Sequence, residues 1–360
     1  MVTRSFLASI GLFVILMGIL TACDGGTEQT PTVTPPPVMT DTPTPPPLVV
    51  DEFDLGGQIF SFTHLNLMKS AGMTWFKQQV VYDQGDSPSS VRSTILAAHG
   101  NGFKVLLSIK GNKEQLAADP THYYQDFANF LGRVAALGPD GIEVWNEQNI
   151  DREWPVGQIG GDAYTQMLTA AYNAIKDANP NVMVISGAPA PTGFFAGCSA
   201  DGCDDAPFLQ QMAEAGAAQF MDCVGIHYNE GILSPTQSSG DPRGNSSHYT
   251  RYYSSMVNTY TAIFPSKPLC FTELGYLSSE GYGRVPPGFE WAADTTVENQ
   301  AIWLAEAATL SKDSGRVRLM IVWNVDATEY GADPQAGYAI IRPGNICNAC
   351  ETLGAVMNGN

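Results

Sequence analysis

The chain has 360 residues, of which 36 are acidic and 18 are basic, so its formal net charge is −18 at neutral pH. This balance argues against nucleic-acid binding and against a basic groove for an anionic ligand, because both need clustered cationic side chains. An acidic surface is compatible with a neutral ligand.

Residues 1–22 have the pattern of an export signal. Arg4 supplies a positive start, and an almost uninterrupted apolar run extends from Phe6 to Leu20. The following Thr-Ala-Cys, which ends at Cys23, resembles a bacterial lipoprotein signal that is cleaved before a lipidated cysteine. We therefore expect an exported protein, anchored to the outer side of the bacterial cell membrane by a lipid only. An ordinary secretory signal or an uncleaved anchor is the alternative.

Residues 23–50 are rich in Thr and Pro, with runs such as Thr-Pro-Thr-Val-Thr-Pro-Pro-Pro. A segment of this composition cannot bury a core and favours extended polyproline II. We expect a disordered spacer that holds the next domain away from the membrane.

Residues 51–360 show no second linker. Apolar, β-branched runs alternate there with amphipathic stretches, which is typical of βα units in a parallel sheet. Strands are expected at residues 58–62, 74–80, 104–109, 142–145, 182–186, 223–227, 268–272 and 317–323. Helices are expected near residues 65–71, 91–101, 123–137, 163–178, 207–216, 248–264, 295–314 and 350–357. Eight such units predict an α/β fold, the (β/α)₈ or TIM barrel, as one catalytic domain.

Six cysteines remain if one of the seven is lipidated, and an exported protein lies in an oxidising setting. Two pairs are close in sequence, Cys198 with Cys203 and Cys347 with Cys350. Short-loop disulfides are favoured over the alternative, a zinc site, because no third His or Cys cluster has ligand spacing. Cys223 and Cys270 lie near the starts of two consecutive strands and are either bonded or simply buried.

Two glutamates stand at the ends of predicted strands: Glu147 after strand four and Glu273 after strand seven. The carboxyl ends of barrel strands form one rim, where His227, Tyr228 and Trp323 are also expected. Hydrolysis of a glycosidic bond needs two carboxyl groups, because one protonates the leaving oxygen while the other handles the sugar cation. The sequence therefore predicts an enzyme that cleaves sugars.

The segments that carry these glutamates resemble a family signature. Trp-Asn-Glu ending at Glu147 and Thr-Glu ending at Glu273 resemble glycoside hydrolase clan A, the retaining (β/α)₈ glycosidases. The run Glu-Val-Trp-Asn-Glu-Gln-Asn, followed by Trp154, is similar to family 39-like and family 5-like cellulase or xylosidase sequences. The resemblance implies that Glu147 is the acid/base, Glu273 the nucleophile of a double displacement, and Asn146 a partner of the sugar 2-hydroxyl.

The two glutamates need different protonation states. A nucleophile must be ionised, so we expect His227 or Tyr228 to donate a hydrogen bond to Glu273. The acid must start protonated, and an ionised Glu273 nearby favours this state of Glu147.

Two tryptophans are candidate sugar platforms. Trp323 is expected to stack on a pyranose at the barrel floor, and Trp154 on the leaving sugar, although an aromatic in a barrel is more often core.

The chain also departs from the clan pattern. Many members carry an Arg at the end of strand two, where this chain offers Lys77 or Gln79. Many read His-x-Tyr on strand six, whereas His227 and Tyr228 are adjacent, so strand alternation points them to opposite sides unless the strand has already ended. Glu143 shares the parity of Glu147 and is expected to face the barrel interior, most simply as a salt-bridged group.

The alternative function is a glycan-binding surface lipoprotein that keeps the barrel without catalysis. Two mutually repelling carboxylates favour the enzyme. Sugar, linkage and endo or exo action stay open, because specificity lies in the βα loops. A carbohydrate is the expected partner, and no metal or organic cofactor is expected.

Overall fold

The computed structural model describes residues 48, 50 and 52–359. The signal peptide predicted at residues 1–22, Cys23 and nearly all of the linker at 23–50 lie outside the described residues. Within the part that is described, no helix has the length and apolar character needed to cross a bilayer.

The described residues form an eight-stranded parallel sheet in the order β5-β4-β3-β2-β1-β8-β7-β6. The strands are β1 (Asp54–Gln58), β2 (Trp75–Tyr82), β3 (Lys104–Gly111), β4 (Gly141–Val144), β5 (Met183–Ser186), β6 (Val224–Tyr228), β7 (Leu269–Leu274) and β8 (Val317–Val322). The two ends of this order meet, because Ile185 of β5 forms a parallel bridge with Cys223, which precedes β6. The sheet is thus a closed, TIM-like barrel, as the sequence predicted.

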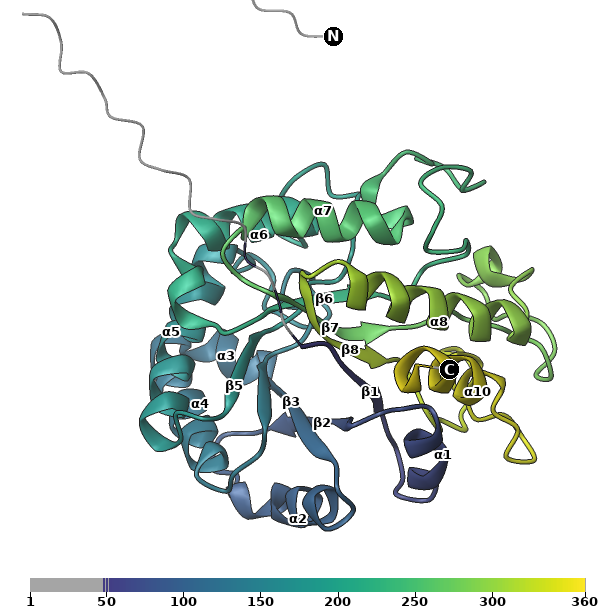
Figure 1. Ribbon diagram of the computed structural model, residues 1–360. Coiled ribbons are helices and arrows are strands. Elements are labelled where there is room, and N and C mark those ends of the chain that lie inside the picture. Colours follow the sequence, from purple (N-terminus) through teal and green to yellow (C-terminus); the bar gives the residue numbers. More distant parts are fainter. Residues whose placement is uncertain (1–47, 49, 51, 360) are drawn as a thin grey trace, which may run out of the picture. The chain divides into compact units, whose positions relative to one another are not determined.

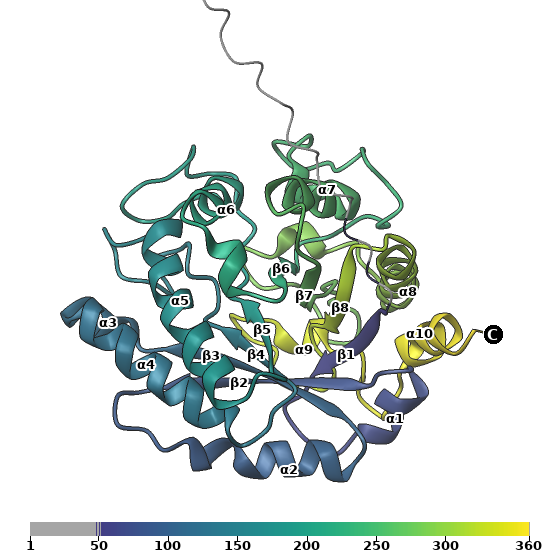
Figure 2. The same ribbon diagram turned by 60° about the vertical axis from the view of Figure 1, so that its left-hand side comes forward.

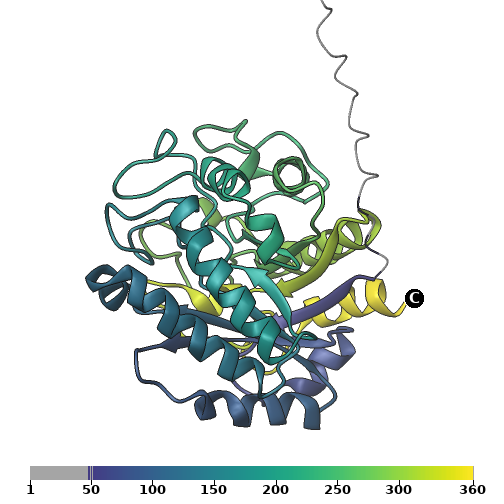
Figure 3. The same cartoon turned by 90° about the vertical axis from the view of Figure 1, so that its left-hand side faces the viewer.

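Helices surround the strands (Figure 1). The α-helices are α1 (Leu65–Ser70), α2 (Arg92–Gly100), α3 (Lys113–Ala118), α4 (Pro120–Ala135), α5 (Gly161–Ala178), α6 (Asp205–Glu214), α7 (Tyr253–Ile263), α8 (Val297–Asp313), α9 (Gln335–Tyr338) and α10 (Asn348–Asn358). The 3₁₀ helices are η1 (Pro88–Val91), η2 (Ala217–Phe220), η3 (Tyr249–Arg251) and η4 (Glu290–Ala292). Helix α10 packs on α1 and α8 (Figure 2), and α4 packs on α5 (Figure 3).

Local sequence signals fix several helix starts. Pro120 opens α4, and the side chain of Asp119 accepts a hydrogen bond from the His122 amide at 3.2 Å. Thr296 and Asn299 form a capping box at the start of α8, with reciprocal hydrogen bonds of 3.0 and 3.1 Å. Such caps satisfy amides that a helix leaves unpaired in its first turn.

The core has two layers. A large apolar layer lies between the barrel and the helices. A small cluster fills the base of the barrel interior and consists of Trp75, Leu106, Ile185, Cys223, Cys270, Leu319 and Ile321. This apolar plug closes the amino-terminal end of the barrel, so polar side chains higher on the strands face only the carboxyl-terminal end.

The expected first strand at residues 58–62 is wrong, because β1 spans Asp54–Gln58. Gly56 and Gly57 disfavour a strand by propensity, yet a Cβ on Gly56 would lie 2.7 Å from both Ile321 and Trp75. The strand therefore uses glycine to admit Ile321 and the backbone and Cβ of Trp75. Phe60 and Phe62, whose apolar character prompted the prediction, are 53% and 42% exposed in the segment after β1.

The other expected strands lie within two residues of the observed ones. The helix expected at residues 248–264 is divided, because η3 (Tyr249–Arg251) precedes α7 (Tyr253–Ile263) and the intervening Tyr252 has an extended backbone.

Candidate active site

Glu147 reaches the barrel interior through an unusual turn. Strand β4 ends at Val144, and Trp145 then adopts φ 79° and Glu147 φ 47°, values that bulky residues rarely show. The Trp145 indole leaves the barrel and packs 5.0 Å from the Trp154 ring. The Glu147 amide donates to the carbonyl of Ala188 at 2.9 Å. This turn is the local structure that presents Glu147 at the rim.

A β-bulge presents Glu273. His227 of β6 pairs with Glu273, although the residue before it, Ile226, pairs with Phe271, so Thr272 is skipped. Cys270 faces the barrel interior, and strict alternation from it would turn Glu273 outward. The extra residue reverses this parity, as bulges do near active sites.

Glu273 is held by a buried lysine and an amide. Lys77 of β2 places its Nζ 3.0 Å from one carboxylate oxygen, and the Asn229 amide donates to the other at 2.9 Å. Lys77 also lies 3.3 Å from Glu143 and is fully buried. Burial alone would lower the pKa of Lys77, but Glu143 and Glu273 outweigh it and raise that pKa. Of the two substitutes for the missing arginine, Lys77 is the one that contacts Glu273.

Glu147 is held by His227 and Arg152. Its Oε1 lies 3.3 Å from His227 Nδ1, and the Arg152 guanidinium donates to its Oε2. Burial would raise the pKa of Glu147, but the hydrogen bond and charge of His227, together with Arg152, hold it at about 2. The expectation that Glu147 is protonated in the free protein is therefore wrong, because it counted Glu273 and missed the two cationic neighbours.

His227 joins the two carboxylates. Its Nδ1 is 3.3 Å from Glu147 Oε1 and 3.7 Å from Glu273 Oε2, so these two oxygens are at most 7.0 Å apart. Burial would lower the pKa of His227, but the charges of Glu273 and Glu147 raise it overall.

Glu143 is fully buried, 4.0 Å from His227 Nε2 and in a salt bridge with Lys77, as the sequence suggested. Burial would raise its pKa, yet Lys77 and His227 lower it.

The two glutamates line one cavity of about 580 Å³ at the carboxyl ends of the strands. Its lining residues are Gln79, Lys110, Asn146, Glu147, Arg152, Glu153, Asn229, Glu273, Phe289, Trp323, Ala332, Asp333, Gln335 and Tyr338. Asn146 is 6% exposed, and its side-chain oxygen has no hydrogen-bond partner among the described residues. An unpaired buried acceptor facing a cavity is suited to a ligand hydroxyl.

Two predicted site residues lie elsewhere. The ring of Tyr228 is on the outer side of β6, where its hydroxyl donates to the Arg251 carbonyl at 3.2 Å, as strand alternation required. Trp154 is 1% exposed between Trp145 and Tyr164, and its indole N–H donates to Gln158 at 2.9 Å. The structure therefore gives neither residue a contact with the cavity, whereas Trp323 lines it.

Several lining residues were missed from the sequence. Asn229 follows His227 by two positions, so strand parity alone would have placed it with Glu273. Arg152 and Glu153 lie in the irregular segment after Glu147, and no periodicity predicts which way such side chains point.

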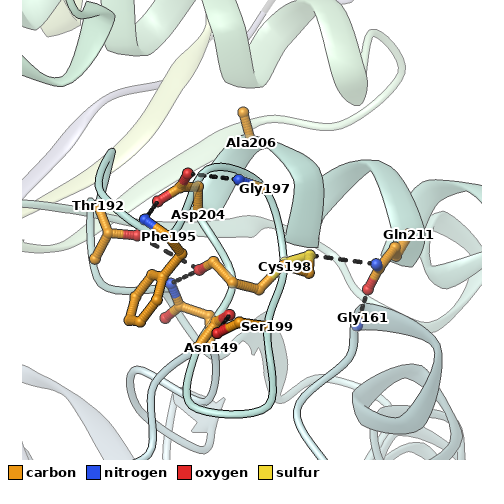
Figure 4. The surroundings of a disulfide bond; sticks show 12 residues. Asn149, Gly161, Thr192, Phe195, Gly197, Cys198, Ser199, Asp204, Ala206 and Gln211 are labelled. Carbon is orange, nitrogen blue, oxygen red and sulfur yellow. Dashed lines mark hydrogen bonds between the residues drawn. A yellow bond between two sulfur atoms is a disulfide. The ribbon is translucent and has the colours of Figure 1, made fainter. Parts of the chain in front are cut away.

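A disulfide loop supports the segment that carries Glu147. Cys198 and Cys203 are bonded between β5 and α6. The Asn149 side chain donates to the carbonyl of Cys203 at 2.9 Å, and the Cys203 amide donates back to the Asn149 carbonyl at 2.8 Å. Figure 4 shows Asn149 beside the loop that carries Cys198 and Asp204. Asp151 and Asp201 are joined by a further backbone hydrogen bond of 3.1 Å. The two loops therefore form one connected unit beside the cavity.

The structure also pairs Cys347 with Cys350, and Cys223 with Cys270. The first of these pairs was predicted, and the second, which the sequence left open, links the residue before β6 to the adjacent strand β7. Over the residues that the structure covers, no group of three or more His, Cys, Asp or Glu is arranged to hold a metal ion.

No family model and no curated protein sequence matches the chain. Solved structures with the same fold do match. A GH5-4 broad-specificity endoglucanase from Clostridium longisporum has a TM-score of 0.57 at 12% identity, covering 84% of this chain and 86% of that one. A glucosidase from Croceicoccus marinus has a TM-score of 0.57 at 16% identity, covering 87% and 68%. An endo-1,4-β-mannanase from Rhizomucor miehei has a TM-score of 0.53 at 12% identity, covering 88% and 97%. At these identities the likeness shows the barrel fold.

Proposed function

We propose that this protein is a retaining glycoside hydrolase that cleaves β-linked oligo- or polysaccharides by double displacement. The observation that carries the proposal is the pair Glu147 and Glu273 in one cavity, with facing oxygens at most 7.0 Å apart across His227. Retaining enzymes need about 5 to 5.5 Å between the carboxyl groups, and inverting enzymes about 6.5 to 9.5 Å. An upper bound of 7.0 Å is compatible with the retaining geometry and excludes most of the inverting range.

Glu273 acts as the nucleophile. Lys77 and Asn229 contact one carboxylate oxygen each, at 3.0 and 2.9 Å, and both stabilise the ionised form that attack on the anomeric carbon requires. The same contacts position the carboxylate from two sides.

Glu147 acts first as the acid and then as the base. In the free protein His227 and Arg152 keep it ionised, so Glu147 takes up its proton only as the leaving sugar binds, and withdrawal of Arg152 would contribute to that change. Arg152 has another partner at hand, because its Nε lies 3.5 Å from Glu153. Once Glu273 is esterified, the same cationic neighbours return Glu147 to the ionised form that activates water.

The names of the structural neighbours, endoglucanase, glucosidase and endo-1,4-β-mannanase, support a β-linked glycan as the substrate class. Neutral groups that line the cavity, among them Asn146, Trp323 and Gln335, match hydroxyls and C–H faces of sugars. We assign Asn146 to the 2-hydroxyl and Trp323 to sugar stacking.

We also propose that the protein is exported and lipid-anchored through Cys23. The disulfides Cys198–Cys203, Cys223–Cys270 and Cys347–Cys350 support an oxidising location. Labelling with radioactive palmitate should mark the wild-type protein and fail to mark Cys23→Ala. Equal labelling of both would contradict the anchor.

Rescue by azide tests the two roles. Glu273→Ala should be inactive on every substrate, and azide should restore cleavage with an α-glycosyl azide as the product. Glu147→Ala should lose about 10²- to 10⁴-fold on substrates with poor leaving groups but keep the first step on dinitrophenyl glycosides, and azide should give the β-anomer. Glu351→Ala, on the exposed side of α10, is the control.

The same anomer from both variants, or inversion in the first-formed product by proton NMR, would contradict the assignment. Glycan binding without hydrolysis of any aryl β-glycoside by the wild type would instead support the alternative, a non-catalytic glycan-binding lipoprotein.

A further inference from the structure

A second cavity of about 250 Å³ adjoins the catalytic one. It is lined by Gln58, Ile59, Phe60, Gln78, Gln79, Val81, Trp323 and Gln335. Gln79, Trp323 and Gln335 line both cavities, so the two form one continuous depression. The catalytic cavity therefore extends toward the carboxyl ends of β1 and β2.

The polar groups of the second cavity are all neutral amides. Gln58 is 3% exposed, and its side-chain oxygen has no partner among the described residues. Leaving such a buried acceptor unpaired costs about 1 to 3 kcal/mol, which a ligand donor would recover. Gln78 is oriented from behind, because its oxygen accepts from the Thr94 hydroxyl at 2.7 Å. Amides both donate and accept, so they match neutral hydroxyls better than carboxylates or phosphates.

An aromatic platform completes the second cavity. Phe60 is 53% exposed and lies edge-to-face with Trp323 at 6.4 Å. Its backbone is fixed, because the Asp326 carboxylate accepts from the amides of Phe60 and Ser61 at 2.7 and 3.1 Å. The Phe60 ring is thus exposed to solvent on a backbone that hydrogen bonds fix in place. This arrangement favours a role in ligand binding over a role in the core.

We propose that this second cavity is a sugar subsite that binds one neutral pyranose unit next to the unit being cleaved. The proposal rests on the glycoside hydrolase function proposed above and names its substrate as a chain of at least two neutral sugars. The volume lies below the roughly 300 to 1,000 Å³ of typical ligand pockets, which fits one sugar unit.

The subsite lies on the side of the sugar that stays with Glu273. The charged neighbours of Glu147, namely Arg152, Glu153 and Lys110, line only the catalytic cavity, on the flank of β3 and β4. The leaving unit receives its proton there. The second cavity contains none of these residues, so it holds the next unit of the retained sugar.

The test compares kcat/KM for 4-nitrophenyl β-cellobioside and β-glucoside, and for the corresponding mannobioside and mannoside. Wild type should prefer the aryl disaccharide and release the intact disaccharide. Phe60→Ala should lower the disaccharide-to-monosaccharide ratio about fivefold, since one stacking contact is lost. Gln58→Ala should lower it by a similar factor, since one hydrogen bond is lost. Thermal melting checks that Gln58→Ala is folded.

Phe62→Ala is the matched control. Phe62 follows β1 as Phe60 does and is 42% exposed, but it packs on Phe76 and lines neither cavity. Its ratio should equal that of the wild type.

A wild-type ratio near one, or a ratio that Phe60→Ala leaves unchanged, would overturn the subsite while leaving the glycosidase intact. If no aryl glycoside is cleaved, the proposed function fails, and calorimetric titration of cellobiose and mannobiose into wild type and Phe60→Ala still decides the subsite. Weaker binding to the variant supports it, and equal binding or no binding to either protein refutes it.

Discussion

Replacing Lys77 with Met should be among the most destabilising single changes at the site. The Nζ atom lies 3.0 Å from Glu273, 3.3 Å from Glu143 and 3.1 Å from the Thr272 carbonyl, with no exposure to solvent. Methionine fills a similar volume but removes the ammonium group that contacts both buried carboxylates, and His227, at 3.7 Å or more, remains as their charged neighbour. Breaking a buried pair in this way costs about 3 to 5 kcal/mol.

Urea unfolding at pH 7 measures this cost directly. Lys104→Met is the control, because Lys104 lies on neighbouring β3, is 43% exposed and pairs with Asp54 at 3.4 Å, a surface geometry worth about 1 kcal/mol or less. A loss below about 1 kcal/mol for Lys77→Met would refute the buried-pair reasoning.

The cost of Lys77→Met should also depend on pH. The folded-state pKa of Glu143 is lowered, against the opposing effect of burial, by Lys77 and His227, so its stabilising contribution is present above its ordinary pKa of 4.5 and disappears as the pH falls. The stability difference between wild type and variant should therefore be largest near neutral pH and narrow below about pH 4. A difference that stays constant across this range would contradict the ionic origin of the effect.

Two further predictions concern the acid/base and the disulfides. Arg152→Ala should raise the pKa of Glu147 and so move the basic limb of the kcat/KM profile to higher pH. The shift should be at most about 0.7 unit, because an exposed ion pair contributes about 1 kcal/mol. A basic limb that does not move, or that moves to lower pH, would count against this role of Arg152. In guanidinium unfolding, the Cys223→Ala/Cys270→Ala variant should lose about 4 kcal/mol of stability, because this bond spans 47 residues. Removing the bond between Cys198 and Cys203, which spans 5 residues, should cost about 2 kcal/mol. Equal losses would show that chain entropy does not govern these bonds.

The barrel and its two glutamates were predictable because their signals are periodic. Apolar runs of strand length alternate with amphipathic helices, and the end of each strand then places Glu147, His227 and Glu273 on one rim. Comparison with the clan pattern at the end of strand two likewise named Lys77 or Gln79 as substitutes for the missing arginine, and Lys77 contacts Glu273. The prediction of the first strand failed, because Gly56 leaves space for Trp75 and Ile321, and Gly57 leaves space for Val325 and Met73. No single-sequence propensity expresses such a requirement.

The failures at the site have a different physical origin. The positive φ of Trp145 directs its indole to the outside of the barrel. Trp154 packs on that indole and is therefore buried in the outer layer. Strict alternation of side chains along β7 would also turn Glu273 outward. The β-bulge, in which Thr272 has no partner on β6, turns Glu273 inward. Turns, bulges and irregular loops break the period on which sequence reasoning depends, and at this site they position the carboxyl groups of Glu147 and Glu273.

The protonation of Glu147 follows from the whole charge cluster and not from its partner alone. Three carboxylates, Glu143, Glu147 and Glu273, face Lys77, Arg152 and His227, a histidine whose pKa is raised by the acids despite its burial. In the proposed mechanism, esterification of Glu273 would remove one negative charge and strengthen the attraction of the cations for the ionised form of Glu147, which suits a base. Protonation for the first step needs the opposite change, and Arg152, whose side chain is 68% exposed, is the cation that can leave. Lys77 and His227 are fully buried, so in the proposed mechanism Arg152 is the cationic neighbour that can withdraw from Glu147 when the leaving sugar binds.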